Sequence, residues 1–226
     1  MANRAYLYSL SNRPTAYADR PETISGLSEW AYAIPFSYRA LLSGDPRLCA
    51  SLVSDGFESE PSDKKSKLYA ISGDFAAGFA RFQKLLTALR PLAAAAPNLT
   101  AIIDETLTFL ETHHDRYLLL ETIELDCMEH ADEAGLRSSV EQEINACFAV
   151  GAAIDALPAD PAAASQTLQQ AAQKKYPPPL DAFHGLRLDD DYDNVYEEKT
   201  EHPLGLEWSE VLYYELWNRA QFAAGG

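Results

Sequence analysis

The sequence lacks the features that mark export, membrane insertion or a disulfide-stabilised fold. Its 226 residues include only three cysteines, Cys49, Cys127 and Cys147, which are widely spaced. This usage fits buried, reduced thiols better than a disulfide framework. No apolar run approaches the roughly 18 residues that span a bilayer, and the opening residues contain no apolar stretch of signal-peptide length. We therefore expect a cytoplasmic protein.

Local catalytic motifs are also missing. The sequence contains no glycine-rich phosphate loop, no Gly-x-Ser-x-Gly nucleophile motif and no His-Glu-x-x-His zinc motif. Catalytic groups can still be assembled from distant parts of a chain, so an enzyme stays open as an alternative. We expect a non-catalytic protein with no cofactor.

Two groups of residues have part of the pattern of a metal site. Glu111 and His114 have the Glu-x-x-His spacing of helical di-iron sites, but a complete site needs a second such pair and two further carboxylates. The run that starts at Asp189 places carboxylates at three positions of a calcium loop, but Asn194 stands where that loop requires glycine. We predict no metal site.

The sequence does have an uneven distribution of charge. Residues 1–103 carry 11 Lys and Arg against 9 Asp and Glu, whereas residues 104–226 carry 7 against 25. Residues 104–133 alone hold ten acids and a single base, Arg116. A field of this sign repels nucleic acid and anionic lipid and attracts basic proteins. We expect a basic protein partner, with no binding to nucleic acid or membranes, and the oligomeric state is left open.

The spacing of apolar residues predicts an α+β fold that is mostly α-helical, with a small amino-terminal sheet and a helical body. Strands are expected at residues 4–10 and 67–72, and helices at residues 34–43, 46–54, 75–89, 98–114, 136–154 and 161–175. The run at 117–128 suits either a buried helix or a strand, and we favour a helix.

Three consecutive prolines divide the chain. Residues 177–179 cannot be helical, because each proline ring fixes φ and removes a hydrogen-bond donor. We expect one globular domain over residues 1–176. Residues 177–226 are expected to pack on it as an acidic loop at 180–206 and a carboxy-terminal helix at 208–222.

Aromatic residues alternate with carboxylates in the acidic half of the chain. Aromatic anchors supply much of the binding energy of protein interfaces, and a charged rim steers association. We expect residues 104–133 and 189–201 to form one acidic docking face. The expected partner-binding residues are Glu121, Glu124, Asp126, Glu129, Asp189, Asp190, Asp191, Tyr192, Asp193, Tyr196, Glu197 and Glu198.

Three segments, Asn3–Pro14, Ile34–Arg39 and Leu68–Phe75, resemble a family of uncharacterised bacterial proteins. The resemblance covers roughly the first 130 residues and implies no activity and no catalytic residue. In size, acidity and lack of catalytic motifs, the chain is also similar to the immunity proteins of bacterial toxin systems. This second likeness favours an immunity protein or inhibitor that binds a basic toxin. A metal-dependent enzyme and a regulator or scaffold are the alternatives.

Overall fold

The structure, a computed structural model, describes residues 3–57, 60–61, 63–92, 97–188 and 202–225. These residues form an antiparallel sheet of five strands with the order β2-β1-β5-β4-β3. The strands are β1 (Arg4–Leu10), β2 (Ile24–Ala31), β3 (Arg47–Ala50), β4 (Tyr69–Asp74) and β5 (Tyr117–Glu121).

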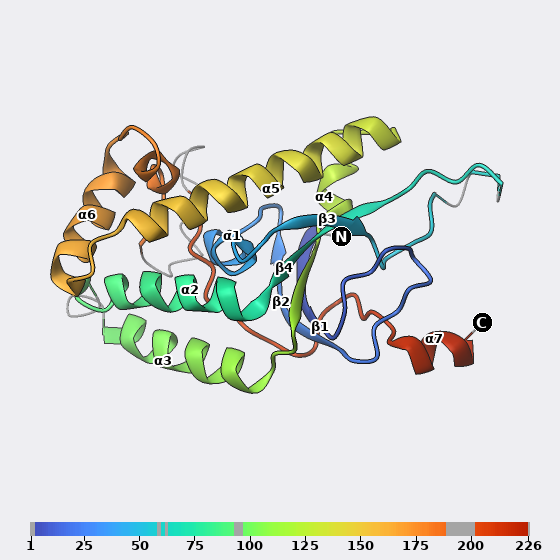
Figure 1. The fold of residues 1–226 in the computed structure, drawn as a ribbon, viewed down its shortest axis with the longest axis horizontal. Coiled ribbons are helices and arrows are strands. Elements are labelled where there is room, and N and C mark those ends of the chain that lie inside the picture. The colour runs from blue at the N-terminus through green and yellow to red at the C-terminus, as the bar shows by residue number, and fades with distance from the viewer. Residues whose placement is uncertain (1–2, 58–59, 62, 93–96, 189–201, 226) are drawn as a thin grey trace.

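Helices pack against one face of this sheet (Figure 1). The helices in the described part of the chain are α1 (Phe36–Leu42), α2 (Phe75–Leu89), α3 (Pro97–Thr112), α4 (Ile123–Asp126), α5 (Glu133–Ala156), α6 (Pro161–Gln173) and α7 (Arg219–Gly225), with a short 3-10 helix at Leu180–Phe183. Of these, α7 lies apart from the helical layer, near the carboxy-terminal end of the chain (Figure 1). None of the helices in the described part of the chain is both long enough and apolar enough to cross a bilayer.

The structure supports the α+β class but corrects the expectation of a mostly helical protein with a small sheet. Fewer than half of the residues are helical, and the sheet has five strands, all within the first 121 residues. The central strand β5 was expected as part of a helix at 117–128. Both faces of β5 are buried, so its residues form a continuous apolar run rather than an alternating one.

Two further expectations differ from the structure in the amino-terminal half. Residues 46–54 do not form a helix, because Arg47–Ala50 is the edge strand β3. The strand β2 was missed, since its sequence ISGLSEWA has few of the β-branched residues that favour strands. Pairing with β1 along its whole length holds β2 in the sheet.

Aspartate side chains begin three of the helices. Asp74, Asp132 and Asp160 each accept a hydrogen bond from the backbone N–H three residues later, at 2.9, 3.0 and 2.8 Å. Such caps satisfy donors that have no partner inside the helix. Three carboxylates of this acidic chain therefore serve the helices themselves.

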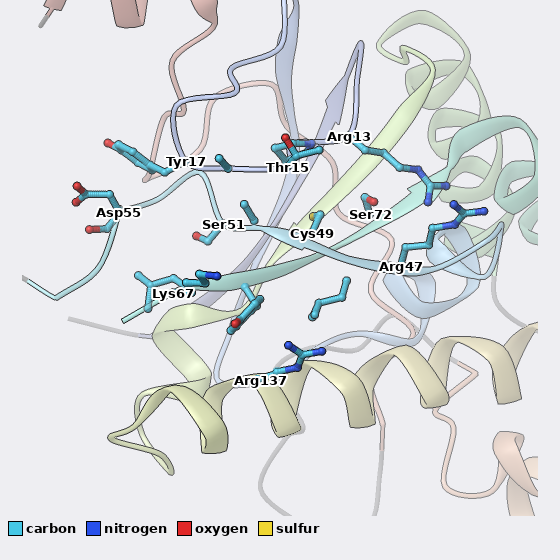
Figure 2. A pocket seen from close by; sticks show the side chains of 17 residues that line it. Arg13, Thr15, Tyr17, Arg47, Cys49, Ser51, Asp55, Lys67, Ser72 and Arg137 are labelled. Atoms are coloured by element: carbon cyan, nitrogen blue, oxygen red, sulfur yellow. The ribbon is translucent and has the colours of Figure 1, made fainter. Parts of the chain in front are cut away.

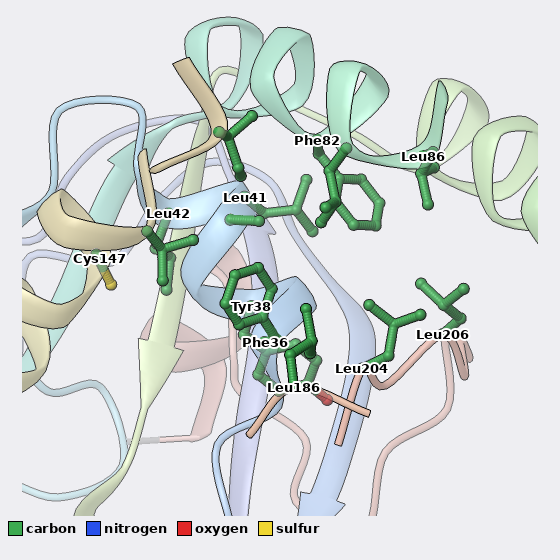
Figure 3. Packing of buried hydrophobic residues seen from close by; sticks show 14 of the residues in the cluster. Phe36, Tyr38, Leu41, Leu42, Phe82, Leu86, Cys147, Leu186, Leu204 and Leu206 are labelled. Carbon is green, nitrogen blue, oxygen red and sulfur yellow. The ribbon is translucent and has the colours of Figure 1, made fainter. Parts of the chain in front are cut away.

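The main core lies between the sheet and the helices and also includes residues from the carboxy-terminal part of the chain. Figure 3 shows Phe36 and Tyr38 of α1 close to Leu186, with Leu204 and Leu206 beyond them. The backbone of α1 is held by the same segment, because the N–H groups of Phe36 and Ser37 donate to the carbonyls of Pro203 and Leu204 at 2.9 and 3.0 Å. These carbonyls take the place of an N-terminal side-chain cap on α1.

Both outer strands of the sheet have backbone partners outside it. On β2, the carbonyl of Leu27 accepts a hydrogen bond from Ser209 N–H at 2.9 Å. On β3, the N–H of Ala50 donates to the carbonyl of Pro14 at 3.2 Å. Each edge is therefore covered in part by a segment that is distant in sequence.

Helices α1 and α2 approach each other closely at Gly78. A Cβ atom on Gly78 would lie 1.6 Å from the carbonyl oxygen of Leu41. We expect Gly78→Ala to lower the free energy of unfolding by about 1–3 kcal/mol or more, because the helices would have to separate. Helix propensity alone predicts the opposite sign, a gain of up to about 1 kcal/mol.

Urea denaturation followed by circular dichroism measures this change. Ala80→Gly, at an exposed position of the same helix, is the matched control and should cost only about 1 kcal/mol of helix propensity. A Gly78→Ala variant as stable as the wild type would contradict the close approach of the two helices.

Candidate functional site

The carboxy-terminal segment, residues 202–218, begins in the main core with Leu204 and Leu206, passes the edge strand β2 at Ser209, and then crosses the sheet face that the helices leave open. Leu212 and Leu216 are buried there in a cluster with Tyr6, Tyr8 and Leu119. The segment is not the helix expected at 208–222, since only Arg219–Gly225 is helical. Its residues alternate instead, with buried or half-buried side chains at even positions from 212 to 216 and exposed ones between them.

Hydrogen bonds fix this segment to the domain. The Tyr8 hydroxyl donates to the carbonyl of Tyr214 at 2.6 Å, and the Tyr214 hydroxyl donates to the carbonyl of Val53 at 3.0 Å. The indole N–H of Trp208 donates to Thr106 Oγ1 of α3 at 2.9 Å. The outward side chains are therefore carried on a backbone with defined contacts.

The outward side chains are mainly apolar or aromatic. Val211 is 76% exposed, Tyr213 58% and Trp217 48%. Glu215 lies between the last two and is also exposed. We call these four residues the C-terminal surface. Large exposed apolar side chains that occur together in this way are typical of interaction sites.

Carboxylates surround the C-terminal surface. Residues 207–217 contain three glutamates and no Lys or Arg. Glu207 and Glu215 are exposed and form no ion pair within the described ranges, while Glu210 lies 2.5 Å from His113 Nε2. The nearest arginines in sequence and space already have acidic partners, since Arg4 pairs with Glu29 and Arg219 with Glu22. The local charge is therefore negative.

Two of the predicted partner-binding carboxylates are in the interior instead. Glu121 is fully buried at the end of β5. Asp126 is 8% exposed and accepts hydrogen bonds from Thr122 Oγ1 and Ser139 Oγ, each at 2.6 Å. Neither carboxylate is available to a partner, and their prediction as docking residues is corrected.

The other two predicted carboxylates of residues 104–133, Glu124 and Glu129, differ in their exposure to solvent. Glu124 is half-buried and accepts hydrogen bonds from the N–H of Arg4 and the hydroxyl of Tyr6, at 2.9 and 3.0 Å. Glu129 is exposed. Glu105 and Glu111 of α3 are exposed too, but α3 and α4 lie on opposite sides of the molecule (Figure 1). Residues 104–133 therefore do not form one acidic docking face.

The remaining predicted partner-binding residues lie outside the described residues. These are Asp189, Asp190, Asp191, Tyr192, Asp193, Tyr196, Glu197 and Glu198. The calcium-like run is part of the same stretch.

Of the two candidate metal ligands, Glu111 is exposed on α3, and His114 follows the helix and packs on another side chain. The ring of His114 stacks on Phe75 with 4.3 Å between ring centroids. The Asp115 carboxylate accepts hydrogen bonds from the Thr23 hydroxyl and the N–H of Arg116. Across the described residues, no group of three or more His, Cys, Asp or Glu side chains could hold a metal ion.

The three cysteines are free thiols, but only Cys147 is buried as expected. Cys49 is partly buried and Cys127 is exposed. Burial raises the pKa of all three thiols above its ordinary value. None is therefore favoured as a thiolate nucleophile.

Glu121 holds a loop against the sheet. Its carboxylate accepts hydrogen bonds from the N–H of Leu52 at 2.6 Å and from Ser51 Oγ at 2.8 Å. Burial raises the pKa of Glu121 from its ordinary 4.5 to about 7, although these hydrogen bonds and the nearby charge of Arg20 oppose the shift. The side chain is thus structural, and sequence reasoning had no signal for its burial.

A raised pKa makes the stability contribution of Glu121 depend on pH. The contribution is fully present below the unfolded-state pKa of 4.5 and is lost as pH rises through about 7. We expect the stability of Glu121→Gln relative to wild type to increase by roughly 3 kcal/mol between pH 4 and pH 8, because glutamine does not ionise. Urea denaturation at several pH values measures this difference. Glu105→Gln, at an exposed site, should show no such change, and a pH-independent difference at Glu121 would contradict the assignment.

Comparison with known proteins places the chain in a family. The family model described as "Domain of unknown function (DUF7822)" matches residues 11–174. The match confirms the resemblance to an uncharacterised family and extends beyond the first 130 residues. No curated protein and no solved structure matches the chain. Since the match covers well over half of the sequence, the chain belongs to the DUF7822 family of domains of unknown function.

Proposed function

We propose that the protein binds a basic protein stoichiometrically through the C-terminal surface, and that it acts as an inhibitor or immunity protein of a bacterial toxin. The single observation that carries the proposal is the group of exposed apolar side chains, Val211, Tyr213 and Trp217, set among carboxylates, where the neighbouring Arg4 and Arg219 are already paired with acids. The proposal replaces the acidic face that residues 104–133 were expected to form.

The two kinds of side chain support different aspects of binding. Tyr and Trp are the residues most often found as energetic anchors at the centre of interfaces. Tyr213 is held in place, because its N–H donates to Glu29 Oε2 at 2.6 Å and the guanidinium of Arg4 lies 5.0 Å from its ring centroid. A side chain that is already ordered loses less entropy on binding.

The charge of the surface selects the class of partner. Glu207 and Glu215 add to the field of a chain with net charge −16. Such a field accelerates encounter with a cationic protein and weakens binding to polyanions. A toxin that binds nucleic acid through a basic cleft is a partner of the required chemistry.

Two substitutions test separately the contribution of an aromatic anchor and that of a negative charge to binding. Trp217→Ala should weaken the complex by about tenfold or more, mainly through faster dissociation. Glu215→Lys should slow association and reduce its dependence on salt. Asp63→Lys makes the same change in charge on the exposed loop before β4 and is the control, which should leave both rates close to those of the wild type.

The partner is first captured at low salt from the native host by the wild-type protein and identified by mass spectrometry. The purified partner is then tested for one-to-one binding to each variant, with rates measured by surface plasmon resonance. If the partner is a toxin, co-expression of wild type but not of Trp217→Ala should restore growth. Recovery of no partner, or of a partner that binds Trp217→Ala and Glu215→Lys as tightly as wild type, would contradict the proposal.

A further inference from the structure

A pocket with a volume of about 560 Å³ lies at the β3 edge of the sheet (Figure 2). Its walls are residues 13–17, the strand β3 with the residues that follow it, the start of β4, and Arg137 of α5. All of its lining residues lie within the part of the chain that matches the family. The carboxy-terminal segment contributes none of them, so this pocket is distinct from the C-terminal surface.

The pocket is basic, although the chain as a whole is acidic. Arg13, Arg47, Lys67 and Arg137 line it, against one acid, Asp55. The Asp55 carboxylate is already paired with Lys65 at 2.5 Å. The pocket thus gathers four of the 18 Lys and Arg residues of a protein with net charge −16.

Two of these cations share a single carboxylate. Arg13 Nη2 lies 3.0 Å and Arg47 Nε 2.9 Å from the same oxygen, Oδ2 of Asp45. The two nitrogen atoms are therefore no more than about 6 Å apart. One carboxylate balances only one of the two guanidinium groups, which leaves an excess positive charge at this end of the pocket.

Arg13 also has hydrogen-bond donors without acceptors. Its Nε and Nη1 are buried and have no hydrogen-bond partner among the described residues. The guanidinium carbon lies 5.0 Å from the ring centroid of Tyr117, which supports the flat face of the group but accepts no conventional hydrogen bond. A buried donor without an acceptor costs about 1–3 kcal/mol, and more when it is charged. An anion beside Arg13 would supply the acceptor.

The arrangement in space is consistent with one anion between two arginines. In Figure 2 the side chains of Arg13 and Arg47 extend to the same end of the pocket, and their guanidinium groups lie close together. Lys67 and Arg137 lie at the other end (Figure 2), where the Arg137 guanidinium is 5.6 Å from the ring centroid of Tyr69. The half-buried Leu48 of β3 adds an apolar wall.

We propose that this pocket binds a small molecule that carries a phosphate group, with the phosphate between Arg13 and Arg47. Arginine guanidinium groups bind phosphate oxygens through paired, charge-assisted hydrogen bonds, and an anionic group offsets the single excess positive charge that two arginines leave beside one carboxylate. The volume is in the range of small-molecule sites. At the other end Arg137 is already paired with Glu141 at 2.8 Å, and Lys67 is placed to contact a second polar or anionic part of the same molecule.

Titration with inorganic phosphate and with pyrophosphate, at constant ionic strength and with chloride as the reference anion, tests the site. We expect saturable binding by isothermal titration calorimetry and a concentration-dependent rise in melting temperature for the wild type. Arg47→Gln should weaken phosphate binding by tenfold or more. Arg47 is exposed and its side chain pairs with Asp45 at the surface, so this variant should fold. Arg13→Gln should have at least as large an effect.

Arg90→Gln is the matched control, because Arg90 is also an exposed arginine in a single ion pair, with Asp104, outside the pocket. It should bind phosphate as the wild type does. Equal binding by Arg47→Gln and Arg90→Gln, or no saturable binding to wild type, would overturn the proposal. Saturation by acetate in place of phosphate would overturn the assignment to a phosphate group.

Discussion

The central strand β5 has to be buried on both faces, but the helices cover only one of them. Leu118 and Leu120 belong to the core beneath the helices, whereas Leu119 faces the opposite side with Tyr6 and Tyr8 of β1. Within the described ranges, the second face has no helical layer of its own. It is covered by the loop after β3 and by the carboxy-terminal segment, whose Leu212 and Leu216 complete the smaller core. Because the segment buries its inward side chains on this face of the sheet, the side chains between them point to solvent.

Among the described residues, the acidity of the chain does not produce one acidic face, because many carboxylates serve the fold itself. Some of them have structural roles at helix ends and in the interior: Asp74, Asp132 and Asp160 cap helices, and Glu121 holds the loop after β3. Others are neutralised by the chain's own arginines, such as Glu143, which pairs with Arg39 between α5 and α1. A net charge counted along a sequence therefore overstates the charge that any one surface presents.

Elements were predicted correctly from the sequence where the spacing of apolar residues fits only a helix or only a strand. Helix α2 and its cap Asp74 were predicted because apolar residues recur there every three or four positions. Elements were predicted wrongly where the apolar residues fit both the helical spacing and the alternation of a strand. Residues 208–222 have apolar side chains at helical spacing, but the buried positions alternate, because the segment lies extended across a sheet. Burial of Glu121 depends on the loop after β3, and that of Asp126 on the packing of α5 beside α4, neither of which a local pattern shows. The pocket was also missed, since Arg13, Arg47, Lys67 and Arg137 meet only through the pairing of β3 with β4 and the packing of α5.

The partners of the two outer strands limit the ways in which this protein can assemble. An open strand edge is a template for another chain, either in functional strand addition or in aggregation. Here Ser209 occupies a carbonyl on β2 and Pro14 occupies an amide on β3, which is only four residues long. Extension of the sheet by a foreign strand would first have to displace these segments. These contacts therefore favour recognition through side chains over the sharing of a backbone ladder.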